Sequence, residues 1–254
     1  MMSADSKKVL SQKLLIMNIA IIGYGRMGHE IEAIARERGH LIKLIVDQDN
    51  TSDLNEENLN GIDVAIEFTT PDAAFNNIVK CLKTRIPVVS GTTGWLEKYD
   101  EIVDICRSSN TSFIHSSNYS IGVNILFRLN KELAKLMDRF HNYHVAIEEI
   151  HHTKKLDAPS GTAIALAGGI METHSEYEQW GSEDKNRNKT IPIGSVREGN
   201  VPGIHIVTWD SEIDTILLKH EARNRKGLAL GAVVAAEYIY SRIGVFTMKD
   251  VMGF

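Results

Sequence analysis

Cysteine is nearly absent from this sequence, and its scarcity excludes a large class of folds. The 254 residues contain two cysteines, Cys81 and Cys106, and both lie in apolar segments whose pattern indicates helices. Two such thiols cannot form the disulfide framework of a small secreted protein. We therefore expect a protein of the reducing cytoplasm.

The sequence also lacks a long hydrophobic run and an excess of positive charge. No segment approaches the roughly 18 apolar residues that a transmembrane helix needs, so we expect no membrane span. The formal net charge is -5, which gives no general reason to expect a nucleic-acid partner. Residues 1–16 have neither the apolar core nor the cleavage site of a signal peptide, and we expect them to be an extension before the folded part.

A glycine-rich turn follows the first apolar segment, residues 18–22. Gly23, Gly25 and Gly28 have the spacing G-x-G-x-x-G, and apolar residues at helical spacing come next. A strand, this turn and a helix in succession are typical of dinucleotide binding. Gly23 would make the tight turn, Gly25 would let a pyrophosphate approach the backbone, and Gly28 would let the helix pack on the strand.

An acidic residue ends the next apolar segment, LIKLIV at 41–46. Asp47 lies about twenty residues after the last glycine, where a carboxylate binds the ribose in dinucleotide-binding folds. No arginine or lysine lies beside it, and a carboxylate would repel a 2′-phosphate. The sequence therefore favours NADH over NADPH.

Strands and helices continue to alternate up to about residue 120. Strands are expected at 63–68 and at the start of 86–95 and 111–122, with helices at 71–83 and 96–108. This alternation predicts an α/β domain with a doubly wound, parallel sheet of the Rossmann type. Ligands bind such sheets at the carboxyl ends of the strands, where FTTP, SGTTG and HSSNYS provide small polar residues.

The pattern changes after about residue 120. A helix is expected at 122–137, a strand at 143–152, a helix at 160–174 and an exposed loop with helical fragments at 172–190. Three strands are expected at 191–199, 203–211 and 213–222, and an apolar helix at 228–243. These elements predict a second, α+β domain with an open mixed sheet. We expect a dinucleotide-binding domain of residues 17–120 plus 231–254, a substrate-binding and oligomerisation domain of residues 121–230, and hinges near 120–124 and 226–231.

The segment EIHHTKKLDAPSGTA, residues 149–163, concentrates groups that carry protons or bind anions. His151 can exchange a proton near neutral pH, and Lys155 adds a positive charge. Asp157 and Pro159 are typical of a helix start, so the next residues would offer N–H and hydroxyl groups to an anion. Those residues are Ser160, Gly161 and Thr162. The composition indicates a site for a small carboxylate substrate that receives hydride and proton.

Other kinds of site are less compatible with the sequence. No tyrosine precedes a lysine by four positions, as in short-chain dehydrogenases, and neither cysteine lies in a polar turn that would suit a nucleophile. A metal site of His151, His152 and Asp157 is disfavoured because adjacent side chains on an extended chain point to opposite faces. His205 and His220 lie in strand patterns and are expected to be structural. Two functions stay open beside a dicarboxylate reductase: a redox sensor that binds NAD(H), and another nicotinamide oxidoreductase.

The order of motifs resembles the 4-hydroxy-tetrahydrodipicolinate reductase (dihydrodipicolinate reductase) family. The element His-His-x-x-Lys-x-Asp-x-Pro-Ser-Gly-Thr is highly specific. The matching stretches are GYGRMG (23–28), FTTP (68–71), GTTG (91–94), SSNYSIGVN (116–124), EIHHTKKLDAPSGTA (149–163), VREGNVPGIHIV (196–207) and KHEARNRKGLALGA (219–232). They cover nearly the whole chain after Met17.

The resemblance implies a role for each matching residue. His151 matches the general acid/base of the family and Lys155 its second proton donor, while substrate carboxylate would bind to His152, Ser160, Gly161 and Thr162. The cofactor would contact Gly23, Tyr24, Gly25, Arg26, Met27, Gly28, Asp47, Gly91, Thr92, Thr93, Ser116, Ser117, Asn118 and Tyr119. The family reduces a cyclic imine dicarboxylate with NADH or NADPH in lysine (diaminopimelate) biosynthesis, and the resemblance implies a homotetramer. The segment after Asp47 and the glycine-rich turn are both shorter than is common in the family.

Overall fold

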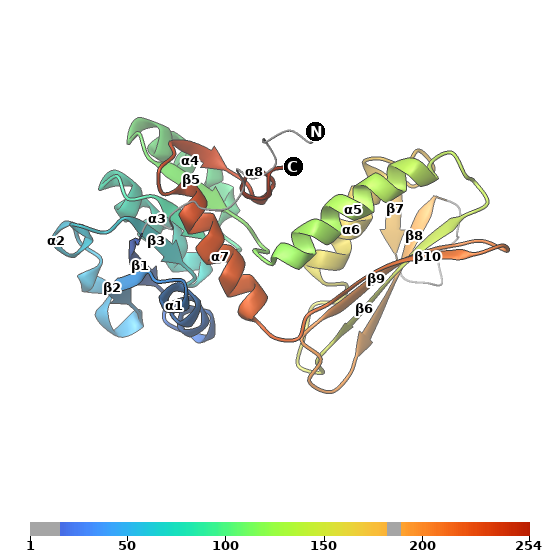
Figure 1. Ribbon diagram of the computed structural model, residues 1–254, viewed down its shortest axis with the longest axis horizontal. Coiled ribbons are helices and arrows are strands. Elements are labelled where there is room, and N and C mark those ends of the chain that lie inside the picture. The colour runs from blue at the N-terminus through green and yellow to red at the C-terminus, as the bar shows by residue number, and fades with distance from the viewer. Residues whose placement is uncertain (1–15, 182–188) are drawn as a thin grey trace, which may run out of the picture.

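The computed structural model describes residues 16–181 and 189–254, which form two lobes (Figure 1). The first lobe contains a six-stranded parallel sheet in the order β11-β5-β4-β3-β1-β2. Its strands are β1 (Asn18–Ile22), β2 (Leu41–Val46), β3 (Val64–Glu67), β4 (Val88–Ser90), β5 (Ser112–His115) and β11 (Gly244–Phe246). From β1 the chain adds β2 on one side and the later strands, beginning with β3, on the other. The direction in which strands are added to the sheet therefore reverses at β1. The doubly wound parallel sheet predicted from the sequence is confirmed.

Helices cover both faces of this sheet because successive side chains of its strands point to opposite sides. In β1, Ile19 and Ile21 belong to one buried hydrophobic cluster, while Ala20 and Ile22 belong to the other. The first cluster includes α1 (Arg26–Glu37) and α7 (Lys226–Ile239). The second includes α3 (Pro71–Lys83) and α4 (Tyr99–Ser108).

Several short elements of the first lobe were not expected from the sequence. The segment after Asp47 forms η2 (Gln48–Asp53) and α2 (Glu56–Leu59), and the chain ends with β11 and α8 (Met248–Met252). The helix expected at 96–108 is a short η3 (Leu96–Lys98) followed by α4. These pieces are too short to show a periodic apolar pattern, so capping residues such as Asn55 and Thr247 define them instead.

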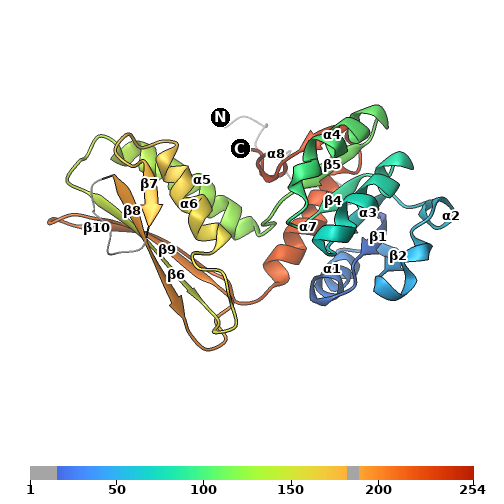
Figure 2. The ribbon, with the colours of Figure 1, turned by 180° about the vertical axis from the view of Figure 1, so that it is seen from behind.

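The second lobe is a five-stranded mixed sheet with two helices on one face (Figures 1 and 2). The strand order is β10-β9-β6-β8-β7, with β6 (His144–His151), β7 (Gln179–Gly181), β8 (Thr190–Arg197), β9 (Ile204–Asp210) and β10 (Thr215–Glu221). The helices are α5 (Ile121–Met137) and α6 (Gly161–Met171). The expected open mixed sheet is confirmed. The interpretation of 172–190 as a loop was wrong in part, because β7 pairs with β8; residues 182–188 of that loop lie outside the described residues.

The chain crosses between the lobes twice, before α5 and before α7. The boundary expected between residues 230 and 231 falls inside α7, and this helix packs on α1 and the first sheet. Gly231 fits there because a Cβ atom would lie 1.7 Å from the carbonyl oxygen of Tyr119. We therefore propose to place the second domain boundary before Lys226. None of the described helices is long and apolar enough to cross a membrane.

An ion pair links α7 to the segment after α1 in the first lobe. Removing this ion pair should destabilise the fold. Glu237 binds Arg38 through two contacts of 2.7 and 2.8 Å, and the Nε2 atom of buried His40 lies 2.9 Å from the same carboxylate. Burial raises the pKa of Glu237, but the bonds to Arg38 and His40 outweigh it and hold the pKa below the usual 4.5. We expect Glu237→Gln to lower the free energy of unfolding by about 2 kcal/mol near pH 7.

Urea denaturation of Glu237→Gln against the exposed neighbour Glu37→Gln measures this contribution. Because the folded-state pKa is depressed, the difference should be present above pH 4.5 and vanish as the pH falls through the folded-state pKa. An equal loss in both variants, or a loss that persists in acid, would contradict the assignment.

Candidate active site

A cavity of about 1060 Å³ lies where the two lobes meet. The first lobe contributes Arg26 and His29 from α1, and the second contributes residues from β6, β9 and β10, among them His151, His205 and His220. Both expected hinge segments also line it. The sequence-predicted residues on its wall are Arg26, Asn118, His151, His152 and Thr162. The structure therefore brings the glycine-rich turn and the His-His element to the same cavity, although 123 residues separate Gly28 from His151.

The glycine-rich turn has the shape that a pyrophosphate requires. Gly23 has φ +93°, and a Cβ atom there would lie 2.0 Å from the carbonyl oxygen of Phe68; one at Gly28 would lie 2.4 Å from that of Gly23. At Gly25, by contrast, a Cβ would meet nothing within 4 Å. Helix α1 starts at Arg26 with no side chain capping its first N–H groups. N–H groups at the start of a helix are suited to a phosphate anion, which is the ligand expected there from the sequence.

Asp47 lies at the end of β2, beside the strand that leads into the turn. Its side chain is exposed, and its backbone N–H donates to Oδ1 of Asn50 at 2.7 Å. The position at the carboxyl edge of the sheet suits a ribose hydroxyl.

A buried carboxylate that the sequence analysis missed organises the loops beside the turn. Glu67, at the end of β3, accepts hydrogen bonds from the Ser90 hydroxyl at 2.6 Å, the Thr92 hydroxyl at 2.8 Å and the Thr69 backbone at 3.0 Å. The strand ends of β3 and β4 are thus joined through one side chain. A buried charge needs such partners, because an unpaired one is costly.

The cofactor-binding residues expected in these loops divide into two groups. The side chains of Thr92 and Tyr119 are buried and bind the protein itself; the Tyr119 hydroxyl donates to the carbonyl oxygen of Ser90 at 2.7 Å. Gly91 gives room to the Phe68 ring, which a Cβ atom would meet at 2.1 Å. Thr93 and Ser117 are exposed. The buried members can shape the loops, and they leave only their backbone for contact with a cofactor.

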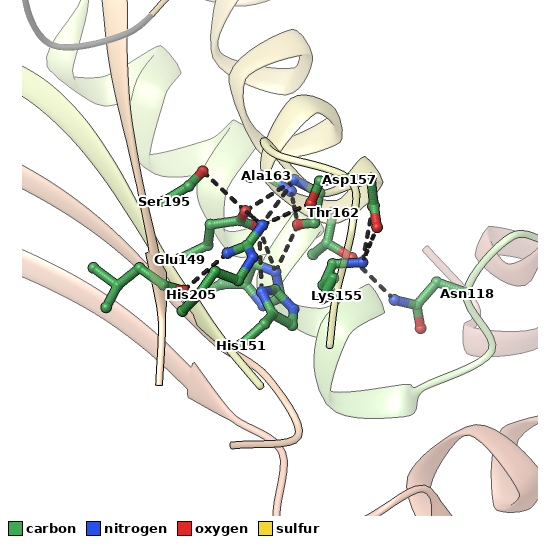
Figure 3. Close-up of polar contacts among 12 residues, drawn as sticks. Asn118, Glu149, His151, Lys155, Asp157, Thr162, Ala163, Ser195 and His205 are labelled. Atoms are coloured by element: carbon green, nitrogen blue, oxygen red, sulfur yellow. Dashed lines mark hydrogen bonds and ion pairs between the residues drawn. The ribbon is translucent and has the colours of Figure 1, made fainter. Parts of the chain in front are cut away.

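The most connected group in the second lobe is Glu149, which is fully buried on β6 (Figure 3). Its two oxygens each lie 3.0 Å from the backbone N–H of Ser160, and Oε1 also accepts from Ser195 Oγ at 3.0 Å and Arg197 Nη2 at 3.1 Å. Burial raises the pKa of Glu149, but the hydrogen bonds from Ser160, Arg197 and Ser195 hold it below the usual value. The carboxylate is therefore charged.

His151 lies two residues further on β6 and on the same buried face. Its Nδ1 atom is 3.4 Å from Oε2 of Glu149, and its ring is 5.1 Å from that of His205, centre to centre. Burial lowers the pKa of His151, which the Glu149 charge opposes, and burial lowers the pKa of His205 to about 4. His205, expected to be structural, lines the cavity beside the expected proton donor.

The start of α6 differs in one respect from the expectation. The helix begins at Gly161 with Ser160 as its N-cap, so Pro159 precedes the helix and is not in its first turn. The Ser160 N–H is taken by Glu149, and its hydroxyl contacts Nε2 of His205 at 3.2 Å and accepts from Ala163. Ser160 thus faces inward, while Gly161 and Thr162 remain at the surface of the helix start.

Lys155 lies in the loop between β6 and α6, where its ammonium pairs with Asp157. Both carboxylate oxygens are 2.8 Å from Lys155 Nζ. Asn118 of the first lobe approaches the same region, with Nδ2 at 3.4 Å from the Thr162 hydroxyl. The His-His element and the loop after β5 are therefore in direct contact (Figure 3).

One group of side chains among the described residues has metal-ligand spacing. The ligand atoms of Glu149, His151 and His205 lie within 4.8 Å of one another. The carboxylate, however, already accepts several hydrogen bonds, and the Arg197 guanidinium adjoins it. A cation would have to compete with this charge, so the donor set does not fit a resident metal ion.

Four residues around His151 were not predicted from the sequence: Glu149, Ser195, Arg197 and His205. Glu149 carried a signal: in a strand that ends at His151, the residue two positions earlier lies on the same face. The other three are opposite β6 only by virtue of the strand register, which pairs Glu149 with Ser195 and His205, and His151 with Arg197. No local pattern reveals that register.

Comparison with known proteins places this site in a family. Residues 17–119 match the family described as dihydrodipicolinate reductase, N-terminus, and residues 122–252 match dihydrodipicolinate reductase, C-terminus. The chain belongs to the dihydrodipicolinate reductase family. A 4-hydroxy-tetrahydrodipicolinate reductase of Christiangramia forsetii is 52% identical over 237 residues, which cover 93% of this chain and 98% of the relative. One of Thermosipho africanus is 34% identical, with coverage of 93% and 98%.

Solved structures agree with the family assignment at the level of the fold. A dihydrodipicolinate reductase from Paenisporosarcina sp. TG-14, with dipicolinate bound, has a TM-score of 0.77 at 24% identity and covers 92% of this chain and 98% of its own. An amine dehydrogenase from Mycobacterium smegmatis has a TM-score of 0.56 at 9% identity, with coverage of 91% and 94%. The resemblance found in the sequence is thus confirmed.

The open space at Gly25 gives a test of the cofactor cradle that leaves the fold intact. A methyl group at Gly25 meets no protein atom within 4 Å, but it would occupy the path of a pyrophosphate. We expect Gly25→Ala to keep the wild-type melting temperature and to raise the Kd for NADH by about tenfold or more. Gly168→Ala in α6, where a Cβ also meets nothing within 4 Å, is the matched control. Equal NADH affinity in the two variants would argue against this cradle.

Proposed function

We propose that this protein is a 4-hydroxy-tetrahydrodipicolinate reductase, an NAD(P)H-dependent oxidoreductase of lysine (diaminopimelate) biosynthesis. The observation that carries the proposal is the agreement between family and site. The chain covers 98% of a reductase with which it shares 52% identity, and Arg26 of its glycine-rich turn lines the same cavity as His151 and His152. A nicotinamide cofactor and a small anionic substrate would meet there.

The first lobe would hold NADH or NADPH. The N–H groups at the start of α1 would bind the pyrophosphate beside Gly25, and the loops ordered by Glu67 would flank the nicotinamide end. When bound, the cofactor supplies a hydride to the substrate. Exposed Asp47 would accept a ribose hydroxyl and repel a 2′-phosphate, so we propose a preference for NADH.

The second lobe would bind the dicarboxylate and deliver the proton. Gly161 and Thr162 offer backbone N–H groups at the start of α6, and half-buried His152 lines the same wall. His151 is placed to give a proton to the reduced ring. Lys155, which Asp157 holds in the neighbouring loop, would be a second donor once the substrate carboxylate competes for its ammonium.

Turnover tests this proposal directly. We expect the wild type to oxidise NADH with freshly generated 4-hydroxy-tetrahydrodipicolinate, and His151→Gln to lose about 100-fold to 10,000-fold in kcat with an unchanged Kd for NADH. His141→Gln, whose side chain is 66% exposed, is the matched control and should keep wild-type activity. The same assay with NADPH measures cofactor preference. Tight NADH binding without turnover in the wild type would instead favour the redox sensor or a different dicarboxylate substrate.

We also propose that the second lobe assembles a homotetramer. Helices cover one face of its sheet, and side chains that alternate with the buried ones lie on the other. Ala146, Thr208 and Leu217 form one cross-strand row there, and Ile206 lies in the next. Leu217 is 53% exposed, so its apolar side chain lies largely in water. Packing against the same face of a second copy would remove these groups from water.

A charge in this row should break the assembly. We expect Leu217→Glu to shift the species seen by light scattering from four times the 28.3 kDa chain mass to smaller forms. Leu96→Glu, at a site of similar exposure on the first lobe, should leave the mass unchanged. A wild type that is monomeric, or an effect of equal size in both variants, would contradict the proposal.

The reducing cytoplasm is the compartment we propose. Cys81 and Cys106 are both free and buried. Burial raises the pKa of the Cys81 thiol to about 12 and that of Cys106 to about 11, so neither forms the reactive thiolate at neutral pH. The two thiols are therefore packing residues in a protein that needs no disulfide.

A further inference from the structure

The two ring nitrogens of His151 have different surroundings. Nδ1 is completely buried and makes no hydrogen bond with any described residue, and Oε2 of Glu149 lies 3.4 Å away. Nε2 lies beside Gly203, where a Cβ atom would be only 3.0 Å from it, and both residues line the cavity. A buried ring nitrogen without a hydrogen-bond partner is costly, so the position of Nδ1 near a carboxylate oxygen, with no hydrogen bond between them, needs an explanation.

The two oxygens of Glu149 are also unequal. Oε1 accepts from the Ser160 backbone, the Ser195 hydroxyl and Arg197. Among residues 16–181 and 189–254, Oε2 accepts from the Ser160 backbone alone. A carboxylate oxygen has room for a second donor, and the Nδ1 atom of His151 is the nearest ring nitrogen. The three donors on Oε1 and the N–H on Oε2 fix the carboxylate plane, so the ring rather than the carboxylate is free to adjust.

We propose that Glu149 is a positioning residue for His151, and that its Oε2 accepts the Nδ1 proton after a small rotation of the imidazole. This hydrogen bond keeps Nδ1 protonated and turns Nε2 toward the cavity, as the atom that exchanges the proton with substrate. The inference deepens the proposed function and rests on the proton-transfer role of His151.

The proton balance of the step is simple. The 4-hydroxyl group of the substrate leaves as water, which gives an unsaturated ring. That ring takes two electrons and one hydrogen as hydride, and the Nε2–H bond of the imidazolium breaks as a second bond to hydrogen forms on the ring. His151 becomes neutral with its proton on Nδ1, still bound to Glu149, and solvent restores the Nε2 proton. Glu149 stays ionised throughout, because its own hydrogen bonds keep its pKa low.

The charges around His151 explain why it needs this partner. The groups that face it are Glu149 on β6, Arg197 on β8, His205 on β9, and Lys155 and Asp157 in the loop after β6. Burial, Lys155 and Arg197 lower the pKa of His151, while Glu149 and Asp157 raise it. Of the two carboxylates that raise the pKa of His151, Glu149 has the larger effect and is the buried one. Removing its charge should therefore lower the pKa of His151 further.

The test is the pH dependence of Glu149→Gln. A general acid is active when protonated, so activity falls as the pH rises through its pKa. We expect the upper limb of the kcat/KM profile to move to lower pH by about one unit or more, which is about tenfold in rate at a pH above the limb. At pH values below the upper limb, the turnover of Glu149→Gln should approach that of the wild type. The Kd for NADH should not change. NMR titration of the His151 imidazole should show the same shift without any assay of activity.

Two further variants separate charge from structure. Ser195→Ala removes one donor to Glu149 without changing its charge, and should leave the position of the limb unchanged. Glu149→Asp keeps the charge at a greater distance and should give a shift between wild type and Gln. If Glu149→Gln does not fold, a downward shift in Glu149→Asp that is absent in Ser195→Ala supports the proposal.

Either of two results would overturn it. One is a loss of turnover in Glu149→Gln that is equal at every pH, and the other is an unchanged His151 titration. Neither result contradicts the proposed reductase function if the wild type turns over and His151→Gln does not. Failure of the wild type to turn over is a failure of the proposed function itself, while the NMR titration still decides the link between Glu149 and His151.

Discussion

The charge of Glu149, buried in the middle of a sheet, is the constraint on which the second lobe depends. A carboxylate with no access to water is tolerated only if donors replace its hydration. Here the donors come from the start of α6 and from β8. Satisfying this one group therefore fixes the angle at which α6 meets the sheet. That angle in turn places Thr162 on the cavity wall.

The first lobe also contains a buried carboxylate that is surrounded by hydrogen-bond donors. Glu67 is buried at the carboxyl end of β3 and gathers the hydroxyls of Ser90 and Thr92. Hydroxyl and N–H donors join loops that sequence alone would describe as separate polar turns. Each lobe thus uses a buried carboxylate to hold loop segments against its sheet. Preorganised donors of this kind bind a ligand with less loss of conformational entropy than mobile loops do.

Much of this architecture could be predicted from the sequence because it depends on local periodicity. The glycine spacing at 23–28 and the alternating strands and helices were sufficient to predict the first sheet, and the His-His element predicted residues that line the cavity, His151, His152 and Thr162. The orientation of side chains in the loops could not be predicted in this way. Thr92, Tyr119 and Ser160 are polar residues in polar loops, and only tertiary contacts reveal that their side chains face inward. A similar limit hid Arg197 and His205, because strand register determines which residues lie opposite β6.

Burial and the proposed proton transfer make opposing demands on His151. Enclosing the cavity would keep water from the reaction, but burial also lowers the pKa of the imidazole that we propose as the proton donor. Lys155 and Arg197, whose positive charges suit a dicarboxylate substrate, lower it further. A fixed negative charge on the far side of the ring offsets both effects without entering the substrate space. The bound dicarboxylate would act in the same direction, since its charges face the lysine and the histidine. The pKa of His151 would then be highest, and its imidazole most fully protonated, when substrate is present to receive the proton.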